Sequence, residues 1–297
     1  MLVKLYGTYV EGLLPLIGED NRIHAHFNQT VTTTGRISCT EPNLQNIPIR
    51  EETGREIRKA FIADSDEYLL VGADYSQIEL RVLAHLSQDE ALIEDFRQGA
   101  DIHRRTAARV FNLSEDAVTP VHRGRAKAVN FGVIYGMSSF GLSEGLGIKR
   151  KEAENYIAEY FKTHSAVQEF LNEQISFCRA KGYVTTLLGR RRWIPDIRAS
   201  VYMVRQAGER LAMNTPVQGS AADIIKLAMI RVHQALVSEK LRSRLILQVH
   251  DELIIQTHVD ELAVVSKLLK ENMEKAIELR VPLIAEINTG RCWYNLK

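Results

Sequence analysis

The sequence lacks the features that mark secreted and membrane-spanning proteins. Its three cysteines, Cys39, Cys178 and Cys292, are scattered and form no Cys-x-x-Cys pair, so we expect no disulfide framework and a reducing cytoplasm. The sequence contains no run of eighteen apolar residues, which predicts no membrane association through a spanning helix. Lys4 and Glu11 interrupt the apolar residues at the start, unlike a signal peptide. A length of 297 residues fits one large domain or two or three subdomains.

An excess of one charge is also missing. The 38 basic and 37 acidic residues give a net charge of +1, which by itself neither favours nor excludes a nucleic-acid partner. Basic residues nevertheless cluster at residues 103–105, 123–127, 149–151 and 190–192. A single basic surface is enough to bind phosphates, although solvated helix faces explain these clusters equally well.

The hydrophobic pattern predicts strands near both ends of a mostly helical middle. The apolar run of residues 68–73 indicates a buried strand directly before Asp74. Two apolar runs around His250 and Asp251 predict a hairpin with a tight turn, and a further strand closes the chain. Helices are expected over residues 77–97, over most of 103–183, over 201–237 with an interruption near Pro216 and Gly219, and over 260–278. The predicted fold class is therefore α+β, with a helical subdomain inserted between the strands of a sheet.

Asp74 and Asp251 are the strongest candidates for a metal site. Each follows or joins a predicted strand, so neighbouring strands would bring both carboxylates to one edge of the sheet. Two Mg²⁺ ions roughly 3.5–4 Å apart stabilise both the attacking and the leaving oxygen in phosphoryl transfer, and Mg²⁺ needs few protein carboxylates when phosphates fill its other positions. Because aspartate is common in turns, an ordinary structural role explains each residue alone.

A second candidate site follows from spacing in the predicted helix of residues 123–135. Arg123, Lys127, Phe131 and Tyr135 recur at every fourth position, and steps of four drift only about 40° around a helix, so the four side chains form one slanting stripe. Two cations followed by two aromatic rings suit the phosphates, sugar and base of a nucleoside triphosphate. An amphipathic surface helix with core aromatics would give the same pattern.

Longer motifs decide between these interpretations. The segments that carry the comparison are Asp74-Tyr-Ser-Gln-Ile-Glu-Leu-Arg81, the Arg123 to Gly136 stripe, Leu247-Gln-Val-His-Asp-Glu-Leu253, Thr34-Gly-Arg36, Pro42-Asn-Leu-Gln-Asn-Ile-Pro48 and Asn214-Thr-Pro-Val-Gln-Gly219. In order and spacing they resemble the motifs of family A DNA polymerases, the family of bacterial DNA polymerase I. The resemblance runs from about Val3 to Lys297 and corresponds to the C-terminal palm and fingers portion.

The resemblance implies specific roles, which we state as expectations. Asp74, Asp251 and the carbonyl of Tyr75 would bind two Mg²⁺ ions. Lys127 is the candidate to protonate the leaving pyrophosphate. The residues expected to bind the incoming dNTP are Arg123, Lys127, Phe131, Tyr135, His103, Gln77 and Glu79. Those expected to contact primer–template DNA are Arg36, Asn43, Gln45, Arg210, Asn214, Gln218 and His250. Glu79 would exclude ribonucleotides, and Phe131 would disfavour dideoxynucleotides, which lack a 3′-hydroxyl.

The resemblance also predicts how the chain is organised. The expected fold is a right-hand polymerase with residues 1–22 as a thumb remnant, 23–90 and 206–297 as the palm, and 91–205 as the fingers. Most of the thumb and all nuclease sequence are missing from it, so we expect weak DNA binding and no nuclease activity in this chain. The protein would be a cytoplasmic, nucleoid-associated bacterial monomer acting in replication and repair. Alternatives are a non-catalytic DNA-binding fragment of a larger polymerase and a single-subunit RNA polymerase, the latter disfavoured by Glu79.

Overall fold

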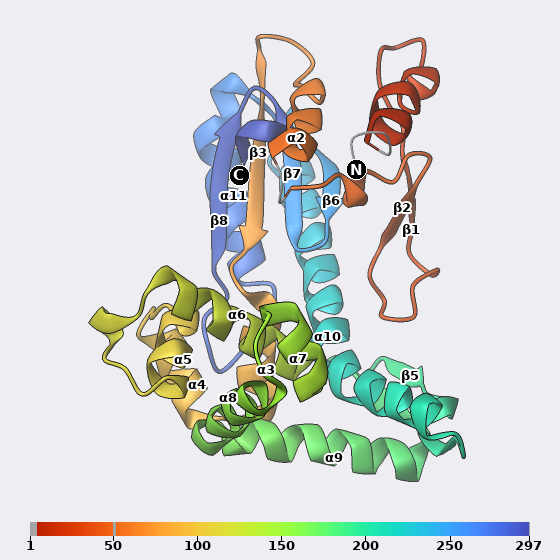
Figure 1. Ribbon diagram of the computed structural model, residues 1–297. Coiled ribbons are helices and arrows are strands. Elements are labelled where there is room, and N and C mark those ends of the chain that lie inside the picture. Colours follow the sequence, from red (N-terminus) through yellow and green to blue (C-terminus); the bar gives the residue numbers. More distant parts are fainter. Residues whose placement is uncertain (1–4, 50–51, 297) are drawn as a thin grey trace. The chain divides into compact units, whose positions relative to one another are not determined.

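The structure, a computed structural model, describes residues 5–49 and 52–296 (Figure 1). Packing divides them into two compact units. The first contains the described residues up to Ser76, together with Ala222–Ile277 and those from Leu283 onward. The second contains Gln77–Ala221 and Glu278–Pro282. The second unit is thus inserted in the first along the chain. The predicted subdomain boundaries differ from these unit boundaries and stay a prediction.

A four-stranded antiparallel sheet forms the centre of the first unit (Figure 1). Its strands lie in the order β6-β7-β3-β8, so that strands from the beginning and the end of the chain are neighbours. The bounds of the strands are β3 Tyr68–Tyr75, β6 Arg244–Val249, β7 Glu252–His258 and β8 Ala285–Gly290. This order confirms the expected pairing of the strand before Asp74 with the later hairpin.

The two faces of this sheet carry different elements. On one face the Tyr75 hydroxyl donates to the Met273 carbonyl of α11 at 2.6 Å. Because side chains alternate along a strand, Gly72 and Asp74 lie on the opposite face, where the buried Trp293 and its neighbours form a core cluster. The other elements of the first unit are η1 Tyr6–Glu11, η2 Leu14–Leu16, β1 His26–Asn28, β2 Ser38–Thr40, η3 Leu44–Asn46, α2 Glu52–Arg55, η4 Glu56–Ala60, η7 Val259–Glu261, α11 Leu262–Glu274 and η8 Trp293–Leu296.

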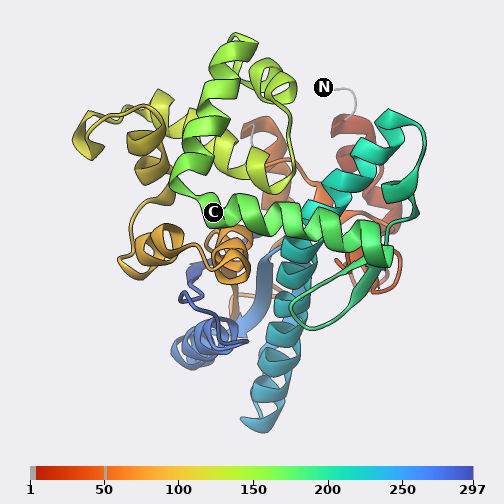
Figure 2. The ribbon, with the colours of Figure 1, turned by 90° about the horizontal axis from the view of Figure 1, so that it is seen from below.

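The second unit is mainly helical, as the sequence predicts. A short hairpin of β4 and β5 follows α9 and packs on its end (Figure 2). The elements are α3 Ile78–Ser87, α4 Glu90–Arg97, α5 Ile102–Val110, η5 Glu115–Ala117, α6 Pro120–Ile134, α7 Ser139–Leu146, α8 Arg150–Thr163, α9 Ser165–Lys181, β4 Tyr183–Thr185, β5 Arg191–Trp193 and η6 Pro195–Arg198. Helix α10, Tyr202–Ser238, contributes its first part to this unit and its remainder to the first. Within the described residues, none of the helices is both long and apolar enough to cross a membrane.

In two of the predicted helices, the structure places the interruptions differently from the prediction. The helix expected over residues 77–97 is divided, because Gln88 adopts a left-handed conformation with φ 56° and Asp89 caps α4 by accepting from the Leu92 amide at 2.9 Å. Conversely, α10 continues through Pro216, so the predicted interruption is wrong. The turn around Pro216 is buried, and the Ser220 hydroxyl donates to the Pro216 carbonyl, so tertiary packing outweighs the lost backbone hydrogen bond.

Candidate active site

Asp74 and Asp251 lie at the same edge of the sheet. Asp74 pairs with Glu252 in the β3–β7 register, and the Tyr75 amide donates to the Asp251 carbonyl at 3.2 Å. Asp251 shares a two-residue turn with His250, whose φ of 55° is the left-handed conformation that such tight hairpin turns require. The structure therefore brings together the two carboxylates that the sequence singled out, and both are half-buried.

Hydrogen bonds between amide side chains connect this turn to η3. Gln45 Nε2 donates to both the backbone carbonyl and Oε1 of Gln248, each at 3.1 Å, and Gln248 Nε2 donates to the His250 carbonyl at 2.5 Å. Asn43 caps η3 by accepting from the Gln45 amide at 3.1 Å. The side chain of His250 remains exposed. Three of the residues predicted to contact DNA thus surround the turn that carries Asp251.

The predicted nucleotide-binding stripe lies on α6 in the second unit. Thr119 caps this helix with a reciprocal hydrogen bond to His122, and Pro120 occupies its first turn. Arg123 Nε donates to Asp101 Oδ2 at 2.7 Å. Lys127 is exposed and has no ion pair among the described residues. In the cationic half of the stripe, Arg123 is therefore held by Asp101, and the ammonium group of Lys127 is accessible to a phosphate.

The aromatic half of the stripe contacts two further predicted residues. The ring centroids of Phe131 and His103 are 5.9 Å apart. Tyr135, at the C-cap of α6, donates its hydroxyl proton to Glu79 Oε2 at 2.8 Å. Glu79 is buried in the first turn of α3, whose N-cap is Gln77 with a φ of 54°. The spacing of the stripe and these contacts place six of the predicted nucleotide-binding residues in one part of the second unit.

His103 is held as a neutral imidazole. Its Nδ1 lies 2.9 Å from Asn130 Nδ2, and Asn130 Oδ1 accepts from the Thr106 hydroxyl at 3.1 Å. Burial, and after it the cations Arg123 and Lys127, lower the His103 pKa from 6.5 to about 4, against an opposing effect of Asp101. An amide donor at Nδ1 leaves the proton on Nε2, so His103 offers a hydrogen-bond donor without a charge.

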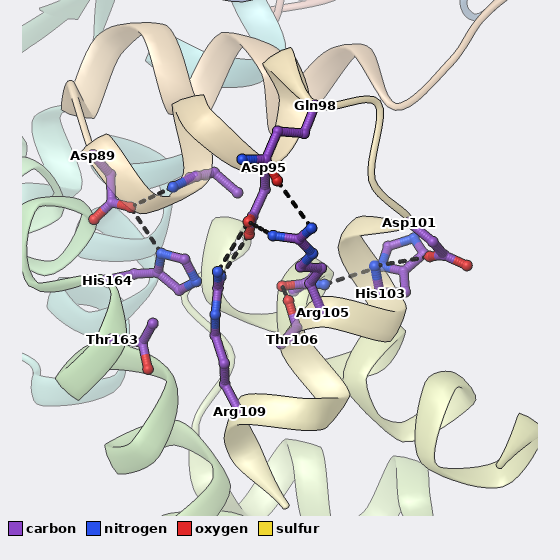
Figure 3. Close-up of polar contacts among 12 residues, drawn as sticks. Asp89, Asp95, Gln98, Asp101, His103, Arg105, Thr106, Arg109, Thr163 and His164 are labelled. Carbon is purple, nitrogen blue, oxygen red and sulfur yellow. Dashed lines mark hydrogen bonds and ion pairs between the residues drawn. The ribbon is translucent and has the colours of Figure 1, made fainter. Parts of the chain in front are cut away.

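A buried ion-pair network supports the helix that carries His103 (Figure 3). Asp95 on α4 is 2% exposed and receives both Nη atoms of Arg109, at 2.5 and 2.9 Å, and Nη1 of Arg105 at 3.0 Å. Arg105 Nη2 also donates to Gln98 at 2.9 Å. Figure 3 shows these arginines reaching from α5 to Asp95, while Asp101 and His103 lie at the start of α5. The network holds α5 against α4. Helix α5 is in turn capped by Asp101, the partner of Arg123 in the stripe on α6.

The remaining predicted DNA contacts lie on a helix and a loop. Arg210, Asn214 and Gln218 recur every fourth residue on α10, which places them on one slanting stripe. Arg36 follows Gly35, whose φ is 82°. At Gly136, with φ 60°, a Cβ atom would lie 2.3 Å from Met213 Cε of α10, so any side chain would have to displace the end of Met213 and would be strained by the positive φ. The atoms that approach this glycine are side-chain atoms of α10, from Met213 and Arg210.

Comparisons with known proteins assign the chain to a family. The family model described as "DNA polymerase family A" matches residues 1–295. The chain belongs to DNA polymerase family A. Its relatives include the DNA polymerase I of Bacillus caldotenax, 52% identical over 100% of this chain and 34% of that protein. The DNA polymerase I of Lactococcus lactis subsp. cremoris is also 52% identical, over 99% of this chain and 34% of its own length. The chain therefore spans about a third of these relatives.

A solved family A structure confirms the predicted fold class. The POL domain of Pol1 from M. smegmatis, solved in complex with DNA primer-template and dNTP, matches with a TM-score of 0.95 at 47% identity. The match covers 99% of this chain and 52% of that chain. The family A chain described above is thus α+β, with an antiparallel sheet and an inserted helical part.

The donors at the sheet edge suit a hard divalent cation. Asp74 supplies carboxylate oxygens from the end of β3 and Asp251 from the turn before the neighbouring β7, and oxygen donors are those that Mg²⁺ prefers. Among the described residues, no group of three or more acidic, histidine or cysteine side chains could hold a metal ion by itself. A metal at this edge would therefore take its remaining ligands from backbone oxygen, substrate phosphate and water.

Three supporting residues escaped the sequence analysis of this family A chain. Asp101 anchors Arg123, Asn130 anchors His103, and Glu252 pairs with Asp74 across the strands. Asp101 carries a local signal, since it caps α5 by accepting from the amides of residues 103 and 104. The contacts of Asn130 and Glu252 depend on long-range packing, which no local pattern reveals.

Proposed function

We propose that this chain is the polymerising portion of a DNA-templated DNA polymerase, which adds deoxynucleotides to a primer 3′ end and releases pyrophosphate. The observation that carries the proposal is the hydrogen bond between Tyr75 and Asp251, which holds the Asp74 and Asp251 strand ends together at one sheet edge. The neighbour's complex with primer-template and dNTP supports the same substrates here. In the cell the protein acts as a cytoplasmic, nucleoid-associated bacterial monomer in replication and repair.

The first unit supplies the metal-binding half of the reaction. Asp74, Asp251 and the Tyr75 carbonyl hold two Mg²⁺ ions. When bound, such a pair stabilises the attacking and leaving oxygens of phosphoryl transfer. The hydroxyl of Tyr75 is committed to Met273, and burial raises its pKa, so this side chain stays protonated. Its role is therefore to fix the strand end, where its backbone carbonyl would be a ligand of the metal.

The second unit supplies the nucleotide-binding half. Arg123 and Lys127 bind the triphosphate, and His103 donates a hydrogen bond from Nε2. Preorganised cations of this kind stabilise the charge that develops on the leaving pyrophosphate. Lys127 then protonates that leaving group as a general acid. Asp101 acts through Arg123, because its carboxylate orients the guanidinium.

Sugar and base recognition fall to the other end of the stripe. Glu79 crowds the 2′ position of the sugar and excludes ribonucleotides; the hydrogen bond from Tyr135 fixes its carboxylate. Gln77 and Phe131 contact the nucleotide beside it. Phe131 lacks a hydroxyl, so the substrate's own 3′-hydroxyl makes the polar contact, which disfavours dideoxynucleotides. The predicted DNA-contacting side chains meet the minor groove, whose acceptors are shared by A·T and T·A pairs, so they test pair geometry without reading sequence.

Primer extension with a metal-site variant tests the proposal. A labelled primer–template, four dNTPs and Mg²⁺ at low salt should give template-dependent extension, lost in Asp251→Asn. Asp260→Asn is the matched control, since Asp260 is exposed and its ion-pair partners, Arg242 at 3.1 Å and His258 at 3.5 Å, are not among the proposed site residues. Extension that survives in Asp251→Asn would refute the assigned metal site. No extension by folded wild-type protein would favour the alternative of a non-catalytic DNA-binding part of a larger polymerase.

A further inference from the structure

Arg58 is a buried cation that the proposed reaction does not use. It lies in η4 and is 3% exposed. Its guanidinium carbon lies 4.1 Å from the ring centroid of the fully buried Trp293. Its Nε and Nη1 atoms are buried, and neither has a hydrogen-bond partner among the described residues. A buried charge is costly unless an opposite charge compensates it, so the position of Arg58 calls for nearby anions.

Those anions lie on the adjacent face of the sheet. Asp74 and Glu252 are directly opposite one another in the β3–β7 register, and Glu252 is 1% exposed. Gly72 shares their face, two residues before Asp74. A Cβ atom at Gly72 would lie 3.3 Å from Glu252 Oε1. The missing side chain therefore leaves room for the Glu252 carboxylate to lie over β3, on the face that Trp293 and Leu296 cover.

This cross-strand pair would be unfavourable without a cation. Like charges directly opposite on antiparallel strands repel one another, and Glu252 is removed from water. Burial lowers the pKa of Arg58, whereas the charges of Glu252 and Asp74 raise it and that of Arg55 lowers it. Arginine keeps its proton in proteins, so Arg58 presents a permanent positive charge to both carboxylates.

We propose that Arg58 is a positioning residue for the metal-site edge, the built-in counter-charge that holds the Asp74 and Glu252 carboxylates in place before divalent cations bind. Its stem and ring contact with Trp293 anchor the charge in the core cluster, while its field acts on both strand ends. In its metal-related part the proposal rests on the proposed function, because Asp74 is there a metal ligand. Arg58 then has two opposed effects. Its positive charge stabilises the metal-free sheet edge, and the same charge weakens the binding of Mg²⁺ there.

A double-mutant cycle tests the counter-charge without any metal. In EDTA, Arg58→Met, which keeps an apolar stem against Trp293, should lower the thermal unfolding midpoint by roughly 6 °C or more. In a Glu252→Gln background the same substitution should lower it by less than about half as much, because one of the two anions is gone. Arg58→Lys, which keeps the charge, should recover most of the loss. Equal losses in both backgrounds would overturn the proposal and leave Arg58 a packing residue.

A Mg²⁺ titration tests the second effect. Mg²⁺ that binds the folded state raises the unfolding midpoint, and we expect Arg58→Met to bind it about threefold or more tightly than wild type, since one facing positive charge is removed. Lys59→Met is the matched control: it removes an exposed cation from the same turn, paired with Glu56 at 2.7 Å, and should leave the Mg²⁺ affinity unchanged.

The outcomes separate this inference from the proposed function. Identical Mg²⁺ affinity in wild type and Arg58→Met would overturn the link between Arg58 and the metal carboxylates. A wild-type protein with no Mg²⁺-dependent shift would refute the metal assignment of the proposed function, while the cycle with Glu252 would still decide the role of Arg58. Tighter Mg²⁺ binding together with non-additive losses would support both.

Discussion

Replacing Asp95 by asparagine should destabilise the protein more than any exposed change on the same helix. Asp95 is 2% exposed and is the shared acceptor of Arg105 and Arg109, whose side chains are 28% and 29% exposed. Asparagine keeps one acceptor oxygen, but its NH2 group cannot accept from a guanidinium and the charge is gone. The substitution therefore breaks at least one of the three hydrogen bonds and leaves two neighbouring guanidinium groups that repel one another. Breaking a buried pair costs about 3–5 kcal/mol. Because both arginines retain contact with water, we expect the lower end, about 3 kcal/mol.

Urea unfolding followed by circular dichroism measures this loss directly. Glu94→Gln is the matched control, since Glu94 precedes Asp95, is exposed and accepts one hydrogen bond from Gln98 at 2.8 Å. Its effect should stay within about 0.5 kcal/mol. The loss in Asp95→Asn should also persist at 1 M NaCl, because salt screens buried pairs weakly. A loss no larger than that of Glu94→Gln, or one abolished by salt, would refute the reasoning.

Two further predictions concern the α6 stripe. Gly136→Ala should destabilise the protein by about 1–3 kcal/mol in chemical unfolding, because the new Cβ meets Met213 and φ is positive. The control is Gly124→Ala, in open space on α6, which should be neutral or stabilising. A larger loss of stability in Gly124→Ala than in Gly136→Ala would contradict the packing. The pKa of His103, about 4, is lower than its ordinary value of 6.5, so folding favours the neutral ring and the associated stability is complete above pH 6.5. It should fall by up to about 3 kcal/mol as the pH drops from 6.5 to 4, and His103→Gln should flatten that decline; an unchanged profile would show that His103 does not cause it.

The fold was predictable where local signals and register agree. The apolar run before Asp74 and the paired runs around Asp251 identify strands, and a two-residue turn allows only an antiparallel hairpin. Helix ends were harder to predict. Gln88 and Asp89 divide the single helix predicted over residues 77–97, although the apolar spacing continues across them. Pro216 predicts a break that burial and packing override, because tertiary contacts outweigh the local cost of one missing hydrogen bond.

The candidate site also contains residues that local sequence signals predict and residues that they do not. Asp74, Asp251 and the α6 stripe could be recognised because strand ends, turns and a spacing of four are local properties of the chain. The groups that hold them cannot be recognised locally: Glu252 looks like an ordinary strand residue, and Arg58 precedes Asp74 by sixteen positions within a charged segment. Only the register that places Glu252 opposite Asp74, and the core that buries Arg58 against Trp293, give these side chains a task.

Residues that meet the substrate and residues that position them differ in burial, and this difference decides which experiments can assign their roles. Asp251 and Lys127, which we expect to meet the substrate, lie at a chain reversal and on an exposed helix face, so their removal should abolish the reaction without much change in stability. A residue that positions them is buried, so its removal changes stability and function together, and activity alone cannot assign its role. For Arg58 and Asp95 the decisive measurements are therefore couplings: between Arg58 and Glu252, between Arg58 and Mg²⁺, and between Asp95 and salt. A structural role without electrostatic content would leave all three couplings at zero.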